Sequence, residues 1–304
     1  MPRKLRREYV LLVFIISFIF VFVGCNGEAN SFRFVFMTDI HVQPEKKATE
    51  GFTFAIKKVN ELEPDFVITG GDLIMDALGQ SYERADSLYN LYTKVLNLFK
   101  MPVYNTLGNH EVFGLYEKSG ISPDHDQFGK KLFMNRVGEG KTYYSFDYKG
   151  WHFIILDGIG YTLDRHYYGH VDSLQLVWLK NDISKVDKKI PVAISTHIPL
   201  FSIYGQMKNG PNYAMSESSV ITNALNVIKV LENHNLRLVL QGHLHIVEEI
   251  NYQNITYITG GAVSGSWWNG PRDGFPEGFI VVDIEGNNFT WHYETYGWQV
   301  EKLE

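Results

Sequence analysis

Short apolar runs alternate with segments of helical periodicity along most of the chain, and this alternation restricts the possible fold more than any other feature of the sequence. The apolar runs predict strands at residues 32–37, 65–69, 102–107, 151–156, 191–195 and 236–240. The periodic segments predict helices at residues 50–63, 82–100, 173–185 and 218–234, with Thr49, Ser81 and Ser173 as the expected N-caps of the first three. Strands that alternate with helices are typical of an α/β core around a largely buried sheet.

The pattern changes near residue 250, where the helical periodicity stops. Three further strands are expected at residues 255–259, 279–284 and 289–293, separated by turns that contain Gly and Asn. We expect this β-rich part of the chain to extend a second sheet over the same core. The predicted architecture is therefore two packed sheets flanked by helices.

Residues 1–24 have the pattern of a signal peptide rather than of a folded segment. A basic start at residues 3–7 precedes an apolar run at residues 10–23, which is shorter than the ~20 residues that a membrane-spanning helix needs. The alternative is a short membrane anchor. The sequence Phe22-Val23-Gly24-Cys25 resembles the lipobox of bacterial lipoproteins, in which the cysteine is lipidated and becomes the mature amino terminus.

The lipobox resemblance implies a protein that is anchored to a bacterial membrane at Cys25 and works outside the cytoplasm. Residues 25–31 would form the lipidated cysteine and a polar tether, and residues 32–304 would form the folded domain. Cys25 is the only cysteine in the sequence, so the folded domain has no disulfide of its own and tolerates an oxidising compartment.

The charge of the chain disfavours nucleic acid as a partner. Four of the 28 Lys and Arg residues and one of the 34 Asp and Glu residues lie in residues 1–24, so the rest of the chain has a formal net charge of −9. Tight binding to a nucleic-acid backbone depends on a basic surface that releases counterions. A nuclease is therefore the less favoured interpretation.

Five of the predicted strands are followed at once by residues of metal-binding types. These residues are Asp39 and His41, Asp72, Asn109 with His110, His197, and His243 with His245. Because the carboxyl ends of the strands line one rim of an open α/β sheet, we expect these side chains to gather at a single site. Each motif alone is weak, since a lone His after a strand is more often a core residue, but five in this order favour a metal site.

The predicted ligand set favours two metal ions over one. Carboxylate, amide oxygen and imidazole together suit Mn, Fe or Zn rather than Ca, and the absence of a thiolate disfavours a structural zinc site. Seven ligands are too many for one tetrahedral ion, and they suit two divalent or trivalent ions that share a bridging carboxylate. Two ions about 3.5–4 Å apart can hold both the attacking and the leaving oxygen of a phosphoryl group.

The series of motifs resembles the calcineurin-like metallophosphoesterase superfamily, whose pattern is Asp-x-His, Gly-Asp, Gly-Asn-His-Asp/Glu, a lone His and Gly-His-x-His. The resemblance covers residues 32–294 and implies a four-layer αββα sandwich of two mixed β-sheets flanked by helices. It also implies hydrolysis of phosphomonoesters or phosphodiesters, with a small-molecule phosphoester as substrate and a metal-bridging hydroxide as the nucleophile.

The resemblance assigns a role to each motif residue. One metal ion would be held by Asp39, His41 and His245, and the other by Asn109, His197 and His243, with Asp72 as the catalytic bridge between them. His110 would bind no metal. It would face the phosphate and stabilise or protonate the leaving group.

The chain departs from the family pattern after the bridging residue. Many members carry a carboxylate three residues later, where it orients the histidine equivalent to His110, but this position is Met75 and the carboxylate Asp76 comes one residue later. Asp76 either takes over the orienting role or is a surface loop acid. Purple acid phosphatases have a metal-binding Tyr in this segment, and residues 72–76 contain none, so that subclass is not expected.

The segment at residues 260–278 is rich in Gly and also contains Trp267, Trp268 and Arg272. It resembles the tail of a bacterial extracytoplasmic subgroup of the superfamily. One hypothesis makes it a wall of the substrate site, with Arg272 touching a phosphate oxygen and the Trp side chains stacking on a leaving group. The alternative is a rigid loop packed on the sheet edge.

Three alternative functions share parts of this pattern. A cyclic-nucleotide phosphodiesterase has all five motifs, although the signals that it controls are mostly cytoplasmic. A non-catalytic surface binding protein that kept the fold would have no need of seven ligands and His110. A metal-storage or sensing module would bind metal without turnover.

Overall fold

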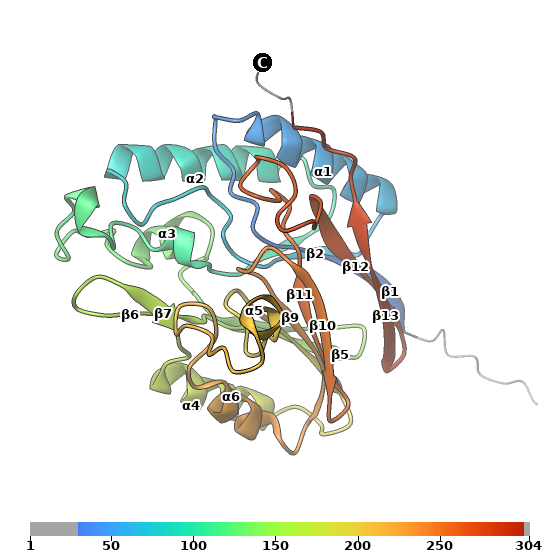
Figure 1. Ribbon diagram of the computed structural model, residues 1–304. Coiled ribbons are helices and arrows are strands. Elements are labelled where there is room, and N and C mark those ends of the chain that lie inside the picture. Colours follow the sequence, from blue (N-terminus) through green and yellow to red (C-terminus); the bar gives the residue numbers. More distant parts are fainter. Residues whose placement is uncertain (1–29, 301–304) are drawn as a thin grey trace, which may run out of the picture.

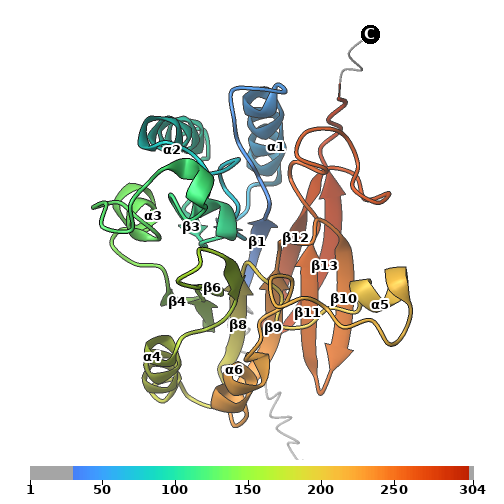
Figure 2. The ribbon, with the colours of Figure 1, turned by 60° about the vertical axis from the view of Figure 1, so that its left-hand side comes forward.

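The computed structural model describes residues 30–300, so the predicted signal peptide and Cys25 lie outside the described residues. Two β-sheets pack face to face, and helices cover the outer face of each sheet (Figure 1, Figure 2). This order of layers confirms the predicted αββα sandwich. Within residues 30–300, no helix is both long and apolar enough to cross a bilayer.

The first sheet has five strands in the order β13-β12-β1-β2-β3. Its strands are β1 (Ser31–Met37), β2 (Phe66–Thr69), β3 (Val103–Asn105), β12 (Gly278–Glu285) and β13 (Asn288–Thr295). β1, β2 and β3 run parallel, whereas β12 is antiparallel to both β1 and β13. The three parallel strands therefore deliver the residues that follow them to the same rim.

The second sheet has six strands in the order β10-β11-β9-β8-β5-β4. Its strands are β4 (Tyr144–Tyr148), β5 (Trp151–Ile155), β8 (Pro191–Thr196), β9 (Asn235–Gln241), β10 (Val247–Tyr252) and β11 (Ile255–Gly260). The four inner strands are parallel, and the edge strands β4 and β10 are antiparallel to their neighbours. A separate hairpin consists of β6 (Ile159–Tyr161) and β7 (Tyr167–Gly169).

Two pairs of helices cover the sheets. α1 (Ala48–Leu62) and α2 (Tyr82–Leu96) lie on the first sheet, at the top of Figure 1, and α4 (Ser173–Ile183) and α6 (Ala224–Leu231) lie on the second, at the bottom. Shorter helices occupy the connections: α3 (Lys131–Arg136), α5 (Tyr204–Asn209) and the 3-10 helices η1 (Asn109–Glu111) and η2 (Glu117–Ser119). The apolar residues of α1 recur at helical spacing, so one face of this helix is buried against the sheet.

Alternating residues of β1 divide the apolar core between the sheets and the helices. Phe32, Phe34 and Phe36 belong to an aromatic cluster that fills the space between the two sheets. Val35 and Met37 belong to the other core cluster, which includes the buried faces of the helices. A strand that is covered on both faces requires this continuous apolar sequence.

Two of the three predicted N-caps differ in the structure. Ser81 caps α2 as predicted. The N-cap of α4 is Asp172, whose side chain accepts a hydrogen bond from the Gln175 backbone N–H at 2.8 Å, and Ser173 is the first residue of the helix. Thr49 lies inside α1 and caps nothing.

The β-rich C-terminal part is shared between the sheets. β11 joins the second sheet, but β12 and β13 join the first sheet beside β1, so the expectation that this part extends a second sheet is wrong for two strands. The helix predicted at residues 218–234 is also shorter than expected. Its first residues form a loop instead, in which the Ile221 N–H donates to the Pro199 carbonyl at 2.8 Å.

Candidate metal centre

The residues that follow five parallel strands meet at one rim of the two sheets. In the first sheet Asp39 and His41 follow β1, Asp72 follows β2 and Asn109 follows β3; in the second sheet His197 follows β8, and His243 and His245 follow β9. Six of these seven residues are at most 3% exposed, and His243 is half-buried. The structure therefore gathers all seven predicted ligands in a largely buried site.

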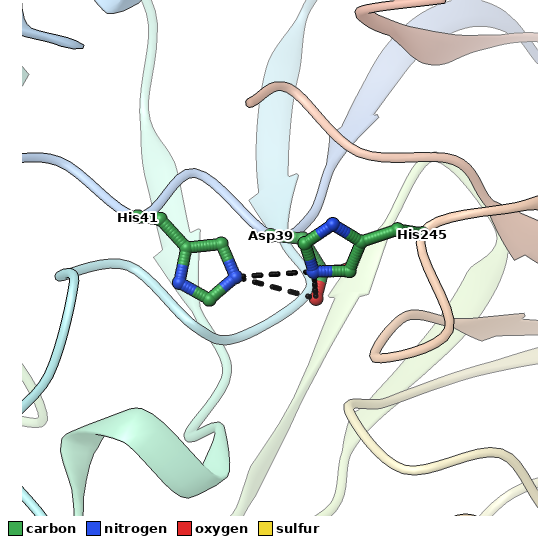
Figure 3. Close-up of side chains that lie close together, drawn as sticks. All are labelled: Asp39, His41 and His245. Carbon is green, nitrogen blue, oxygen red and sulfur yellow. Dashed lines mark hydrogen bonds and ion pairs between the residues drawn. The ribbon is translucent and has the colours of Figure 1, made fainter. Parts of the chain in front are cut away.

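One half of the site consists of Asp39, His41 and His245, whose side chains point toward one another (Figure 3). His245 Nε2 lies 3.1 Å from Asp39 Oδ1 and 3.1 Å from His41 Nε2. His245 Nδ1 lies 2.5 Å from the Gly265 carbonyl, which only accepts, so Nδ1 carries the proton and Nε2 keeps its lone pair. Lone pairs from three residues thus converge on one point.

The other half consists of Asn109, His197 and His243. His197 Nε2 lies 3.1 Å from Asn109 Oδ1 and 3.2 Å from His243 Nδ1. His197 Nδ1 lies 2.8 Å from the Gly70 carbonyl, so Nδ1 keeps its proton and Nε2 is the nitrogen that can bind a cation. The tautomer of this histidine is therefore fixed in the same way as that of His245.

Asp72 lies between the two halves. Its Oδ2 is 3.1 Å from His197 Nε2 and 3.7 Å from His41 Nε2. With metal–ligand bonds of about 2.0–2.2 Å, two ligand atoms at a right angle lie about 3 Å apart. Each half therefore has the spacing of ligands to one ion, and Asp72 Oδ2 is within reach of both.

Five of the seven ligand residues have a left-handed backbone, which non-glycine residues rarely adopt. Their φ angles are 55° for Asp39, 48° for His41, 51° for Asp72, 71° for His243 and 57° for His245. Each such residue costs on the order of 1 kcal/mol or more unless its surroundings impose the conformation. Here backbone bonds across the strand ends impose it, such as the 2.9 Å bond from His41 N–H to the Asp72 carbonyl. Strain concentrated on these positions is typical of a functional site.

Burial and neighbouring charges set the protonation of the site. Burial lowers the pKa of His41 well below its usual value, and burial together with His197 lowers that of His243 to about 4. Burial by itself raises the pKa of Asp72, but the neighbouring histidines outweigh it and keep this carboxyl ionised. Burial lowers the pKa of His197, but the Asp72 charge raises it further, to about 9. Ionised carboxylates beside the neutral imidazoles of His41 and His243 make a site for cations, and a cation bound at His197 Nε2 would replace a proton there.

Glu111 holds the ligand loops together, a role that the sequence analysis did not assign. Its buried carboxylate accepts backbone N–H groups from Gly108 at 2.8 Å, Asp72 at 2.9 Å, Leu73 at 2.8 Å and Ile74 at 3.2 Å. Burial, and after it the charge of Asp72, raises the pKa of Glu111 to about 7. The signal in the sequence was the acid that ends Gly-Asn-His-Glu, because a carboxylate at a buried turn needs backbone donors.

His110 adjoins both ligand groups, because its ligand atom and those of His41 and Asp72 all lie within 4.8 Å of one another. Its Nε2 lies 3.8 Å from Asp72 Oδ2, and its Nδ1 is hydrogen-bonded to the Met75 carbonyl. Asp76 accepts instead from the backbone N–H of Leu78 at 2.8 Å. The structure therefore favours the loop-acid interpretation of Asp76, and the backbone of Met75 orients His110 in its place.

The Gly-rich segment before β12 packs on the half of the site that contains His245. The ring of Trp267 lies 4.7 Å from the ring of His245, and the Arg272 guanidinium lies 4.8 Å above the ring of Trp267. Trp268 is fully buried and donates from Nε1 to the His41 carbonyl at 3.0 Å. The expectation that both Trp side chains stack on a leaving group is therefore wrong for Trp268, which supports the ligand loop from within.

Comparison with known families covers nearly the whole described chain. Residues 32–247 match the family described as calcineurin-like phosphoesterase. Residues 257–302 match the family described as the C terminal of calcineurin-like phosphoesterase. The first match contains all seven predicted ligands, and the second contains the segment with Trp267 and Arg272.

Two curated relatives bear different descriptions. The chain is 29% identical to purple acid phosphatase 23 of Arabidopsis thaliana over 157 residues, which cover 50% of this chain and 30% of that protein. It is 24% identical to a probable cyclic nucleotide phosphodiesterase of Fibrobacter succinogenes over 230 residues, which cover 73% of this chain and 77% of that protein. The chain therefore spans less than a third of the Arabidopsis protein and most of the bacterial one.

Two solved structures share the fold. A dimetal phosphatase from Danio rerio superimposes with a TM-score of 0.63 at 15% identity, over 87% of this chain and 96% of that one. A purple acid phosphatase from yellow lupin superimposes with a TM-score of 0.57 at 15% identity, over 89% of this chain and 52% of that one. The similarity to the Danio rerio protein extends over almost its full length.

Proposed function

The chain belongs to the calcineurin-like phosphoesterase family, and on that premise we propose that it is a binuclear metal-dependent hydrolase of phosphomonoesters or phosphodiesters. The observation that carries the proposal is the position of Asp72. Its Oδ2 lies 3.1 Å from His197 Nε2 in one ligand group and 3.7 Å from His41 Nε2 in the other. A carboxylate shared in this way places two cations side by side, as phosphoryl hydrolysis by two metal ions requires.

The residues present fit two ions. Asp39, His41 and His245 would hold one ion, Asn109, His197 and His243 the other, and Asp72 both. Asp39 Oδ1 is buried and has no hydrogen-bond partner among the described residues, as expected of an oxygen reserved for a cation. Oxygen and imidazole ligands without a thiolate suit Mn, Fe or Zn.

The chain itself supplies orientation and a proton. When bound, two cations would lower the pKa of a water molecule and neutralise charge on the phosphate. The bond from His110 Nδ1 to the Met75 carbonyl fixes the imidazole, so its Nε2 is the atom that faces Asp72. In its protonated form His110 donates from Nε2 to the leaving-group oxygen of the ester.

A cyclic-nucleotide phosphodiesterase is the second candidate function. It is favoured by the Fibrobacter succinogenes relative, which matches 73% of this chain and 77% of its own length. A phosphomonoesterase is favoured by the description of the Arabidopsis thaliana relative, although this chain covers only 30% of that protein. The two functions use the same metal centre and differ in whether the bound phosphate carries one ester bond or two.

Metal removal and restoration test the function. The purified protein is stripped of metal, loaded with Mn²⁺, and assayed with an aryl phosphomonoester, an aryl phosphodiester and 3′,5′-cyclic AMP. Hydrolysis that depends on the metal is expected for at least one of them, and the ratio of rates selects the ester class. A protein that binds two metal ions and hydrolyses none of the three would contradict the proposal.

Two histidine variants provide a matched pair for this assay. His197 is buried at the centre of one ligand group, whereas the His166 side chain is 75% exposed and lies 3.5 Å from Asp164 on the β6–β7 hairpin. His197→Ala should abolish hydrolysis and lower the metal content. His166→Ala should leave both unchanged, which separates loss of a ligand from the general effect of removing an imidazole.

The proposed location is the outer side of a bacterial membrane, with a lipid anchor at Cys25. The support for it is the sequence Phe22-Val23-Gly24-Cys25 after an apolar run. Cells that express the full chain and incorporate labelled fatty acid should yield a labelled, membrane-associated protein whose amino terminus is residue 25, and Cys25→Ser should remove the label. A membrane-associated natural chain that carries no label and keeps residues 1–24 would favour the short membrane anchor instead.

A further inference from the structure

A tight turn presents Arg272 beside the metal centre. Arg272 and Phe275 exchange backbone hydrogen bonds of 2.9 and 2.8 Å, and between them Asp273 and Gly274 have φ angles of 48° and 89°. Two positive φ angles in a two-residue turn are typical of type I′, for which Asp-Gly is a favoured sequence. The local sequence therefore fixes the backbone that carries Arg272.

Helix α5 fastens this turn through Asp273. The Asp273 carboxylate accepts hydrogen bonds from Lys208 Nζ at 2.9 Å and from the Tyr204 hydroxyl. Tyr204 and Lys208 are four residues apart on α5, so they lie on the same face of the helix. The contact from Asp273 to Arg272 Nε is long, at 3.9 Å, and the charge of Asp273 is directed mainly to α5.

The Arg272 guanidinium is partly buried and has unused donors. Its Nε is buried without a hydrogen-bond partner among the described residues, and 35% of its side chain is exposed. The guanidinium lies 4.8 Å above the Trp267 ring, and stacking of this kind holds the planar group in place while leaving its N–H groups free. A guanidinium with unfilled donors is suited to a carboxylate or phosphate.

Trp267 sets the distance between Arg272 and the ligands. The Trp267 ring lies 4.7 Å from the His245 ring and 6.0 Å from the His41 ring. The ion pair of Arg272 among the described residues is with Asp273, so its guanidinium is more than ion-pair distance from both Asp72 and Asp39. Arg272 is thus connected to the metal centre through the Trp267 ring, and it pairs with neither of the two carboxylates.

We propose that Arg272, supported by Trp267, binds a second phosphate of the substrate, so that preferred substrates carry two phosphate groups. This inference rests on the proposed phosphoesterase function and names its substrate class. It changes the roles expected from the sequence. The Trp267 ring carries Arg272 instead of a leaving group, and Arg272 contacts a phosphate other than the one that is cleaved.

Binding of two non-hydrolysable anions tests the proposal without requiring turnover. Inorganic phosphate and methylenediphosphonate differ by one phosphorus group, and their affinities for the Mn²⁺-loaded protein are measured by titration calorimetry. Metal content is checked after each titration, because a diphosphonate that strips Mn²⁺ would mimic weak binding. Four proteins are compared: the natural chain, Arg272→Ala, Arg272→Lys and the control Arg33→Ala.

Arg33 is a suitable control because it is of similar exposure and lies on β1 at the end opposite the metal centre. Its side chain is 38% exposed and pairs with Asp283 at 2.7 Å. The natural chain and Arg33→Ala should bind methylenediphosphonate at least tenfold more tightly than phosphate. Arg272→Ala should lose most of that tenfold margin while its phosphate affinity changes less than threefold, and Arg272→Lys should fall between them.

Two results would overturn the proposal. An equal loss of affinity for both anions in Arg272→Ala would mean that Arg272 serves the cleaved phosphate itself. If the natural chain did not prefer methylenediphosphonate over phosphate, or if Arg272→Ala kept that preference unchanged, Arg272 would not bind a second phosphate. Failure of the proposed function is a separate result, since it appears as absent hydrolysis in metal-loaded protein whatever the two affinities are.

Discussion

The carboxylate of Glu111 accepts the backbone N–H of Asp72 at 2.9 Å, so a residue that occupies no metal position holds the shared ligand in place. The same carboxylate accepts three more backbone N–H groups, from Gly108, Leu73 and Ile74. The loops after β2 and β3 are thereby joined at one buried point. The left-handed backbone of Asp72, with φ of 51°, depends on this joint.

Glu111→Ala should destabilise the metal-free protein by about 3 kcal/mol or more, because four buried N–H groups lose their acceptor at about 1–3 kcal/mol each when unsatisfied. Urea unfolding of the variant and the natural chain measures the difference. The exposed Glu61 on α1 provides the control, and Glu61→Ala should change stability little. Equal midpoints for Glu111→Ala and the natural chain would refute the structural role.

Asp72→Asn should abolish hydrolysis and reduce the metal content below two ions per chain. The amide oxygen that remains is a weaker ligand than a carboxylate, and the negative charge between the two ligand groups is lost. Elemental analysis and the aryl ester assay measure the two effects. Two ions per chain together with full activity in this variant would contradict the assignment of Asp72 as the shared ligand.

His110→Ala should lower turnover by a factor of about 10² or more, as expected for loss of a positioned proton donor. Metal content should stay near that of the natural chain, since Asp39, His41 and His245 can hold the neighbouring ion without His110, whose Nδ1 bonds the Met75 backbone. Turnover and metal content are measured on the same preparation, because only both together distinguish a proton donor from a ligand. Loss of metal in His110→Ala would make it a ligand rather than a donor.

Gly265→Ala should weaken the half of the site that contains His245. Gly265 has φ of 55°, an added Cβ would lie 2.5 Å from the Gly270 carbonyl oxygen, and the Gly265 carbonyl receives His245 Nδ1. We expect a loss of about 1–3 kcal/mol of stability from backbone strain and overpacking. We also expect a lower affinity for the ion that Asp39, His41 and His245 would hold. Thermal unfolding and metal titration measure both.

Gly286→Ala is the control for that experiment. Gly286 has φ of 61° in the turn between β12 and β13, and open space surrounds an added Cβ. An alanine at this position has the same backbone strain but no clash, and the position is far from the ligand residues in the sequence. If the two variants lost stability and metal affinity equally, the close packing at Gly265 would have no special role.

Asp65 should contribute stability that disappears in acid. Burial raises the pKa of Asp65, but hydrogen bonds from Lys149 and Tyr148 outweigh it and hold the pKa below the usual 3.8. A depressed pKa in the folded state means that the contribution is complete above pH 3.8 and is lost as pH falls through the folded value. Asp65→Asn should therefore cost about 1 kcal/mol at pH 7 and progressively less as the pH falls below 3.8, as a series of urea unfolding curves from pH 7 into acid will show.

The gathering of these side chains at one rim could be predicted from sequence because it depends on a local rule. Asp39, Asp72 and His197 each follow a strand within three residues, and parallel strands of one sheet end at the same rim. Nothing beyond strand periodicity and residue type is needed for that inference. The same rule brings together residues that are far apart in the chain, which is why the site was predictable before its geometry was known.

Long-range pairing was harder to predict. β12 pairs with β1 through Phe34 and Val282, which lie far apart in the sequence, and no local pattern tells which sheet a C-terminal strand will join. Adjacent residues in the Gly-rich segment posed a similar difficulty. Trp267 and Trp268 both have a positive φ, and it is the packing of Trp268 against Gly51, together with its bond to the His41 carbonyl, that distinguishes the buried ring.

Backbone partners were also hidden from sequence reasoning. The orienting group for His110 is the carbonyl of Met75, and a carbonyl is present at every residue. The sequence therefore drew attention to the nearest carboxylate, Asp76, which turns out to bond the Leu78 N–H. Side-chain motifs reveal first contacts with a ligand better than they reveal what holds those side chains in position.

The most direct test of the metal centre is anomalous X-ray diffraction from crystals of the Mn²⁺-loaded protein. Two manganese peaks are expected about 3.5–4 Å apart, with the Asp72 carboxylate bonded to both and with His245 and His197 on opposite sides. A single peak, or two peaks that do not share Asp72, would contradict the binuclear centre on which the proposed hydrolysis depends.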